Sequence, residues 1–183
     1  MKRFIHLDRA FLAAIVAAAT ALSLIGAAQA GPPNPVVPPQ IQVPDGNKVF
    51  LVGHAVGVQI YSCDGTAWSF VAPRANLYGD NGKLVVTHFV GPTWQANDGS
   101  TVVGQVVSRV TVDATAIPWL LLSAASTAAG PDGDRLVETT YIQRIATTGG
   151  VAPPPADCNA TTAGTQAEVP YTADYYFWKH TGD

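Results

Sequence analysis

Short apolar stretches alternate with turn-forming clusters along most of this chain, and that pattern predicts an all-β protein. The clearest predicted strand runs from residue 101 to residue 113. Its alternate valines share one face: Val102, Val106, Val110 and Val112. An apolar period of two is typical of a strand with one buried and one wet side. After residue 43 no stretch keeps a clean period of 3.6 for three turns, so no long helix is expected there.

Turn signals separate this strand from the other predicted strands. Gly, Asn and Asp cluster at 44–46, 63–65, 79–82, 97–99 and 130–133. These residues tolerate positive φ or hydrogen-bond their own backbone, which favours hairpin turns. Asp98 and Gly99 are accordingly interpreted as turn residues, and Pro92 as the end of a strand.

Further strands are expected over 83–90, 116–124, 135–148 and 173–178. The run at 116–124 is apolar throughout, which is typical of a strand covered on both faces. Short, regularly spaced strands predict a single antiparallel domain of sandwich or barrel-like form. It would contain many hairpin turns and at most a short helical turn, placed within 156–164.

The beginning of the chain differs from this pattern. Residues 1–30 combine a basic start, an apolar run and Ala28-Gln29-Ala30, which predicts a secretory signal peptide; a retained membrane anchor is the alternative. Residues 31–42 contain five prolines, which predicts an extended, disordered leader. The β-rich domain would then span 43–183. Because of the predicted signal peptide, we expect export to the periplasm or the extracellular space. We expect no transmembrane segment once the signal peptide is removed.

Charge and cysteine content narrow the classes of function. The net charge is −3, and removal of the basic signal segment makes the remainder more acidic. The basic residues are scattered, so a nucleic-acid partner is not expected. The two cysteines, Cys63 and Cys158, would form a disulfide in an oxidising compartment, and two buried thiols are the alternative.

Candidate chemistry centres on a few polar and aromatic residues. Alternation places His88 on the apolar face of its strand and His54 on that of another, where the two could be structural or line a pocket. The chain has no HxH, HxxxH or CxxC, so no metal site is predicted. It also lacks GxGxxG and a P-loop, so no cofactor is expected. No GxSxG motif is present to indicate a nucleophilic serine.

Aromatic residues give the sequence its most unusual segment, 169–180. Tyr175 and Phe177 would face one side of a strand, and Tyr176 and Trp178 the other. One pair should enter the core, while the other covers a sheet face or offers a flat surface to a sugar or another apolar partner. Trp94 has the same two interpretations, core aromatic or stacking platform.

Several segments together resemble a family of secreted bacterial and fungal proteins that is classed as a domain of unknown function. The segments occur in a fixed order: GVQIYSC (57–63), HFVGPTWQANDGS (88–100), AIPWLLL (116–122), TYIQRIATTGGVAP (140–153) and VPYTADYYF (169–177). The resemblance covers about 43–177 and implies the same pair of cysteines, Cys63 and Cys158. It implies no activity, substrate or catalytic residue.

The first hypothesis for function is a non-enzymatic, exported domain that binds a small molecule, a glycan or an envelope component. The ligand-binding residues it names are His88, Trp94, Gln143, Arg144 and Tyr175. A second hypothesis is an extracellular hydrolase that uses His88 with Asp98 or Asp174. A third is a structural envelope protein in which the aromatic residues only pack.

Overall fold

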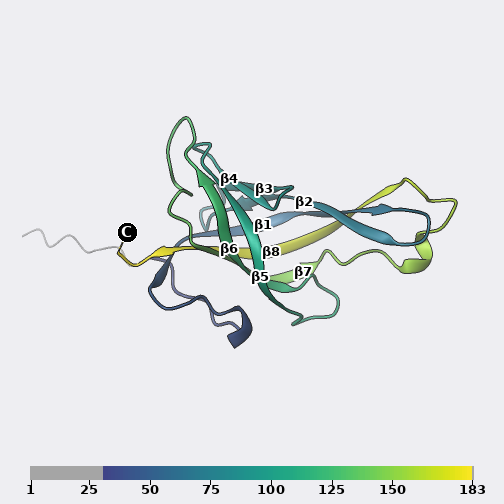
Figure 1. The fold of residues 1–183 in the computed structure, drawn as a ribbon, viewed down its shortest axis with the longest axis horizontal. Coiled ribbons are helices and arrows are strands. Elements are labelled where there is room, and N and C mark those ends of the chain that lie inside the picture. The colour runs from purple at the N-terminus through teal and green to yellow at the C-terminus, as the bar shows by residue number, and fades with distance from the viewer. Residues whose placement is uncertain (1–30, 183) are drawn as a thin grey trace, which may run out of the picture.

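Four of the five predicted turns join two strands that pair with each other, and the turn at 44–46 leads into the first strand. The strands are β1 (Asn47–Cys63), β2 (Trp68–Tyr78), β3 (Leu84–Phe89), β4 (Thr93–Ala96), β5 (Thr101–Val110), β6 (Trp119–Ala128), β7 (Tyr141–Gly149) and β8 (Gln166–His180). In the computed structural model, which describes residues 31–182, consecutive strands are antiparallel neighbours. β1 also pairs with β8, so the sheet closes into a barrel (Figure 1). The prediction of an all-β, sandwich or barrel-like antiparallel domain is confirmed, and the strands close into a barrel. The predicted signal peptide lies outside the described residues.

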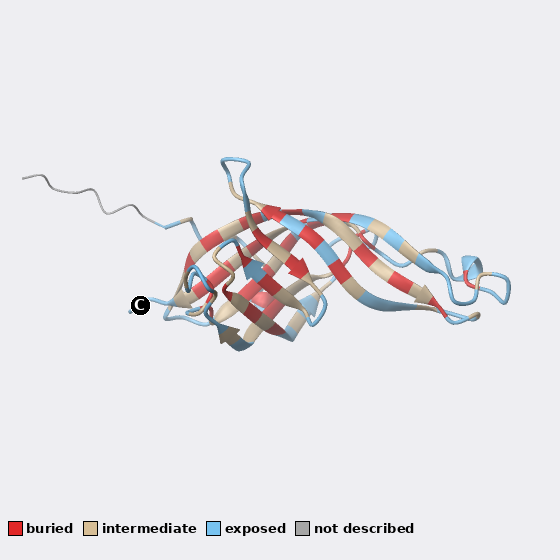
Figure 2. Cartoon of the chain, turned by 90° about the horizontal axis from the view of Figure 1, so that it is seen from above, coloured by how far each residue is buried: buried red, intermediate tan, exposed pale blue. Residues whose placement is uncertain are grey.

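Three strands extend well beyond the barrel and form an arm. The ends of β1, β2 and β8 project together to one side, as Figures 1 and 2 show. At the tip, Cys63 is bonded to Cys158, which confirms the predicted disulfide. Cys158 follows a 3-10 helix, η2 (Pro155–Asp157), in the connection between β7 and β8. The bridge therefore holds this connection against the end of β1.

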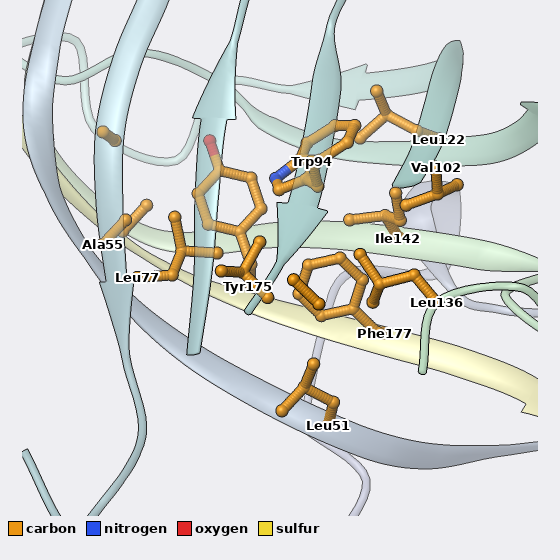
Figure 3. Packing of buried hydrophobic residues seen from close by; sticks show 14 of the residues in the cluster. Leu51, Ala55, Leu77, Trp94, Val102, Leu122, Leu136, Ile142, Tyr175 and Phe177 are labelled. Atoms are coloured by element: carbon orange, nitrogen blue, oxygen red, sulfur yellow. The ribbon is translucent and has the colours of Figure 1, made fainter. Parts of the chain in front are cut away.

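Inward-facing side chains fill one part of the barrel. Buried positions alternate with more exposed ones along the strands (Figure 2). The cluster inside includes Leu51, Leu77, Val86, Trp94, Leu122, Leu136, Ile142, Tyr175 and Phe177. Figure 3 shows Trp94, Tyr175 and Phe177 in its middle, between Leu77 on one side and Leu122 on the other. Of the two pairs that the sequence left open, Tyr175 and Phe177 enter the core, and Trp94 is a core aromatic with 1% of its surface exposed.

Gly104 makes room for the indole of Trp94. A Cβ atom at this position of β5 would lie 2.9 Å from Trp94 Cζ3 and 3.1 Å from Leu122 Cδ2. Such a contact is too close for a real Cβ unless the ring shifts. Strand β5 therefore carries a glycine where the barrel needs the space for an aromatic ring.

The leader departs from its prediction at its C-terminal end. Residues 39–41 form a 3-10 helix, η1 (Pro39–Ile41), and Ile41 is completely buried. It packs on the outer face of the barrel against Leu121 and Ile145. Leu122 faces the core instead, so β6 is covered on both faces, as its apolar run predicted. The five prolines of the leader did not prevent Ile41 from packing on the barrel. Proline restricts the backbone, but apolar side chains in the same segment can still be buried.

Two face assignments from the sequence were wrong. His54 lies on the outer face of β1, because the inward positions there are small residues such as Gly53 and Gly57. A Cβ on Gly57 would lie 2.2 Å from the Arg74 carbonyl oxygen, so β1 approaches β2 too closely for a side chain. On β5, a register shift between Val106 and Ser108 turns Val110 outward, toward the leader.

Candidate functional site

The barrel contains a cavity of about 540 Å³ beside its packed core. Every strand contributes to its wall, β1 to β8 in turn: Gln59, Phe70, His88, Trp94, Val106, Leu120, Arg144 and Tyr175. Phe70 and Val106 are respectively 55% and 40% exposed, so they form part of the mouth. An eight-stranded barrel has an interior of a size that side chains can fill or that one small ligand can occupy. Here side chains fill only part of it.

Four of the five predicted ligand-binding residues line this cavity: His88, Trp94, Arg144 and Tyr175. Gln143 does not line the cavity, because its side chain lies on the opposite, outer face of β7. Its Nε2 donates to the carbonyl oxygen of Ile41 at 2.7 Å, and its Oε1 accepts from Trp178 Nε1 at 2.9 Å. Gln143 thus holds the leader on the outside of the barrel. Ligand binding by the other four residues stays a prediction.

His88 forms part of the cavity floor as a neutral imidazole. Its ring stacks on Trp94 with 4.2 Å between centroids and meets the edge of Tyr175 at 5.4 Å. Burial lowers the pKa of His88 to about 3, and the positive charge of Arg144 acts in the same direction. Nδ1 lies 2.9 Å from the carbonyl oxygen of Thr93. Since a carbonyl oxygen only accepts, Nδ1 carries the proton and Nε2 presents a lone pair.

Arg144 is the cation inside the barrel. Its Nε and Nη2 donate to the carbonyl oxygen of Pro118 at 3.2 and 2.8 Å. No carboxylate within residues 31–182 forms an ion pair with it. Burial raises the pKa of Tyr61, and the charge of Arg144 partly offsets that rise. Burial raises the pKa of Tyr171 as well, and the charge of Arg144 opposes that rise.

Sequence reasoning missed several polar residues of this wall. Gln59 is buried, and its Nε2 has no hydrogen-bond acceptor in the described part of the chain. Arg109 lies at the exposed end of β5. Gln59 could have been found as the one polar side chain on the inward face formed by Gly57 and Tyr61. Arg109 had no distinguishing signal, because the alternation put it opposite Val106 and Val110, on the face of its strand that was predicted to be wet.

The hydrolase hypothesis needed Asp98 or Asp174 beside His88, and the structure places neither there. Asp98 caps the turn before β5 by accepting from Ser100 N and Oγ and from Arg135 N. Asp174 lies on the outer face of β8 and bonds His54 at 2.7 Å. Among residues 31–182, no three His, Cys, Asp or Glu side chains cluster in a way that could hold a metal ion.

His54 on the outer face gives a testable pH dependence. Its nitrogens lie 2.9 Å from Asp80 and 2.7 Å from Asp174, and these hydrogen bonds raise the pKa of His54 above 6.5. The pairing therefore stabilises the fold fully below pH 6.5, and the contribution is lost as pH rises through the raised pKa. His54→Gln should lose more stability relative to wild type at about pH 6 than at about pH 9.

Denaturant melts at the two pH values measure this difference. The effect should be small, because nearly half of the His54 side chain is exposed and solvent screens its ion pairs. His180→Gln, at the exposed end of β8, is the matched control for the loss of an exposed histidine. A His54→Gln penalty that is equal at both pH values would show that the pairing does not depend on the charge of the imidazole.

Closure through β1 and β8, together with an interior cavity, defines the class: an eight-stranded antiparallel barrel with an internal pocket. Comparison with known proteins adds the family. The model of the family described as "Protein of unknown function (DUF3455)" matches residues 44–179, and the chain belongs to this family. No curated protein and no solved structure matches the chain. The resemblance to a domain family of unknown function is confirmed at that level.

Proposed function

We propose that this protein is a non-enzymatic binder that holds one small ligand inside the barrel. The observation that carries the proposal is the cavity of about 540 Å³, to which all eight strands contribute. Small-molecule sites in proteins are typically concave, mostly apolar and about 300–1,000 Å³ in volume. Side chains from Leu120, Leu122 and Ile117 supply apolar walls, while His88 and Arg144 add polar groups to fix orientation.

We further propose that the protein acts after export. The basic and apolar pattern of residues 1–30 supports this proposal, and so does the Cys63–Cys158 bridge, since disulfides persist in oxidising compartments. No helix within residues 31–182 has the length and apolarity to cross a membrane. Amino-terminal sequencing of secreted protein should begin at or near Gly31. An intact Met1 in a membrane fraction would instead favour the tethered alternative.

Blocking the mouth of the cavity tests the binding proposal. Val106 and Val107 are neighbours on β5 and 40% and 58% exposed, but only Val106 lines the cavity. Val106→Trp should reduce the affinity for the neutral apolar dye Nile red by roughly tenfold or more, which corresponds to about 1.4 kcal/mol. Val107→Trp, the matched control, should leave the affinity within about twofold.

The other hypotheses give different results in the same titrations. A structural envelope protein would bind no probe saturably. A glycan binder that uses its outer aromatic residues would bind an oligosaccharide panel, and Val106→Trp would leave that binding unchanged. Equal loss of Nile red binding in both variants would also contradict the proposal, because it would place the probe outside the barrel.

A further inference from the structure

The charged residues of the cavity wall are opposite in sign to the net charge of the chain. The protein carries a net charge of −3. The wall of the cavity nevertheless includes two arginines, Arg109 and Arg144, and no aspartate or glutamate. Neither arginine forms an ion pair with a carboxylate of residues 31–182. A pocket with positive charge in an acidic protein favours a negatively charged ligand.

Arg144 has hydrogen-bonding capacity that the fold does not use. Two of its N–H groups are directed at a single acceptor, the Pro118 carbonyl oxygen. A guanidinium has further N–H donors and cannot release its charge. The same carbonyl contact holds the group at a fixed place in the wall. Arg144 is half-buried and bonds a neutral carbonyl, so a bound anion would offset the cost of partly desolvating this cation.

A second donor lines the same cavity as Arg144. Gln59 Nε2 is buried and meets no acceptor in full hydrogen-bond geometry among the described residues, although the Gln59 side chain interacts with the Tyr171 hydroxyl and lowers its pKa. The side chains of Gln59 and Ile117 both lie against Gly150, and Ile117 directly precedes Pro118, the partner of Arg144. Gln59 thus lies on the part of the cavity wall that includes Ile117 and Pro118. A buried donor without a partner costs free energy that a ligand acceptor would recover.

We infer that the ligand is an apolar-bodied monocarboxylate, whose carboxylate accepts hydrogen bonds from Arg144 and Gln59 while its body contacts the apolar wall. A planar carboxylate matches the fork of the guanidinium. Leu120, Leu122 and the Trp94 ring supply the wall for the body. This inference rests on the proposed function, because it assigns the chemistry of a ligand bound in the same cavity.

Matched pairs of ligands test recognition of the carboxylate separately from ligand binding in the cavity. The probes are 2-naphthoate with the neutral 2-naphthalenemethanol, and decanoate with decanol, each titrated by calorimetry into the mature protein. Wild type should bind each acid about tenfold to a hundredfold more tightly than its alcohol. Arg144→Met should remove this preference and change alcohol binding by about twofold at most. Arg74→Met, on the exposed outer face, should leave both unchanged.

Gln59→Leu gives an independent reading that does not depend on how well Arg144→Met folds. It removes the unpartnered donor at nearly constant volume, so it should weaken acid binding several-fold and spare the alcohols. If wild type binds acids and alcohols equally, or if Arg144→Met and Gln59→Leu keep the acid preference, the carboxylate inference is overturned and the cavity proposal stands. If wild type binds neither acids nor alcohols, both are overturned.

Discussion

Replacing Cys63 and Cys158 with serine is expected to lower the free energy of unfolding by about 4–5 kcal/mol. The two residues are 95 positions apart, and cross-linking a loop of this length removes a large conformational entropy from the unfolded chain. The loss is a large share of the ~5–15 kcal/mol that stabilises a typical domain. Urea denaturation of wild type and the double variant, with fluorescence as the signal, measures it.

The position of the bridge also predicts where the protein loosens first. Cys63 lies two residues beyond Tyr61, and Tyr61 lines the cavity and donates to the Gly150 carbonyl oxygen at 2.7 Å. Reduction should therefore increase hydrogen exchange in the arm, and weaken ligand binding, before the barrel unfolds. Wild type treated with reductant should reproduce the double variant. A stability change below about 1 kcal/mol would show that pairing within the arm is sufficient to hold the β7–β8 connection.

Trp94→Ala is expected to destabilise the barrel by about 3–5 kcal/mol. Trp94 is almost fully buried, stacks on His88 and meets the rings of Tyr175 and Phe177 edge to face. Removing it leaves a hole that these rigid neighbours cannot close, since Gly104 offers no side chain to fill it. Denaturant melts monitored by circular dichroism give the change.

Trp119→Ala is the control for the loss of an indole elsewhere. Trp119 is only partly buried and packs on the outer face with the leader, so its removal should cost less than that of Trp94. Equal losses in the two variants would mean that the outer cluster stabilises the fold as strongly as the interior. That result would contradict the description of Trp94 as the centre of the core.

Local chemistry made much of this fold predictable. Asp98 and Gly99 form the turn that their residue types indicate, and Gly99 adopts a positive φ of 81°. Cys63 and Cys158 pair as their even number suggested. Closure into a barrel was not predictable in the same way. It depends on the pairing of β1 with β8, which lie more than a hundred residues apart and leave no local pattern.

The candidate site was predicted in part, and its errors have physical causes. Gln143 and Arg144 are consecutive in a strand, so the period of two already required them to face opposite sides. Treating both as ligand-binding ignored that rule. His54 was predicted to face inward because the residues that alternate with it are large and apolar. The inward face of β1 is instead formed by small residues that allow close approach of β2. Unused donors such as Gln59 Nε2 become visible only with the complete barrel.

The central claim is that the barrel interior binds a ligand, and methyl NMR during a titration tests it most directly. With Nile red or 2-naphthoate, saturable shifts are expected at Ile117, Leu120 and Leu122, which line the cavity. The exposed Val56 and Val112 on the outside should remain unchanged. Shifts confined to the outer valines, or no saturable shift at the three cavity residues, would contradict the account.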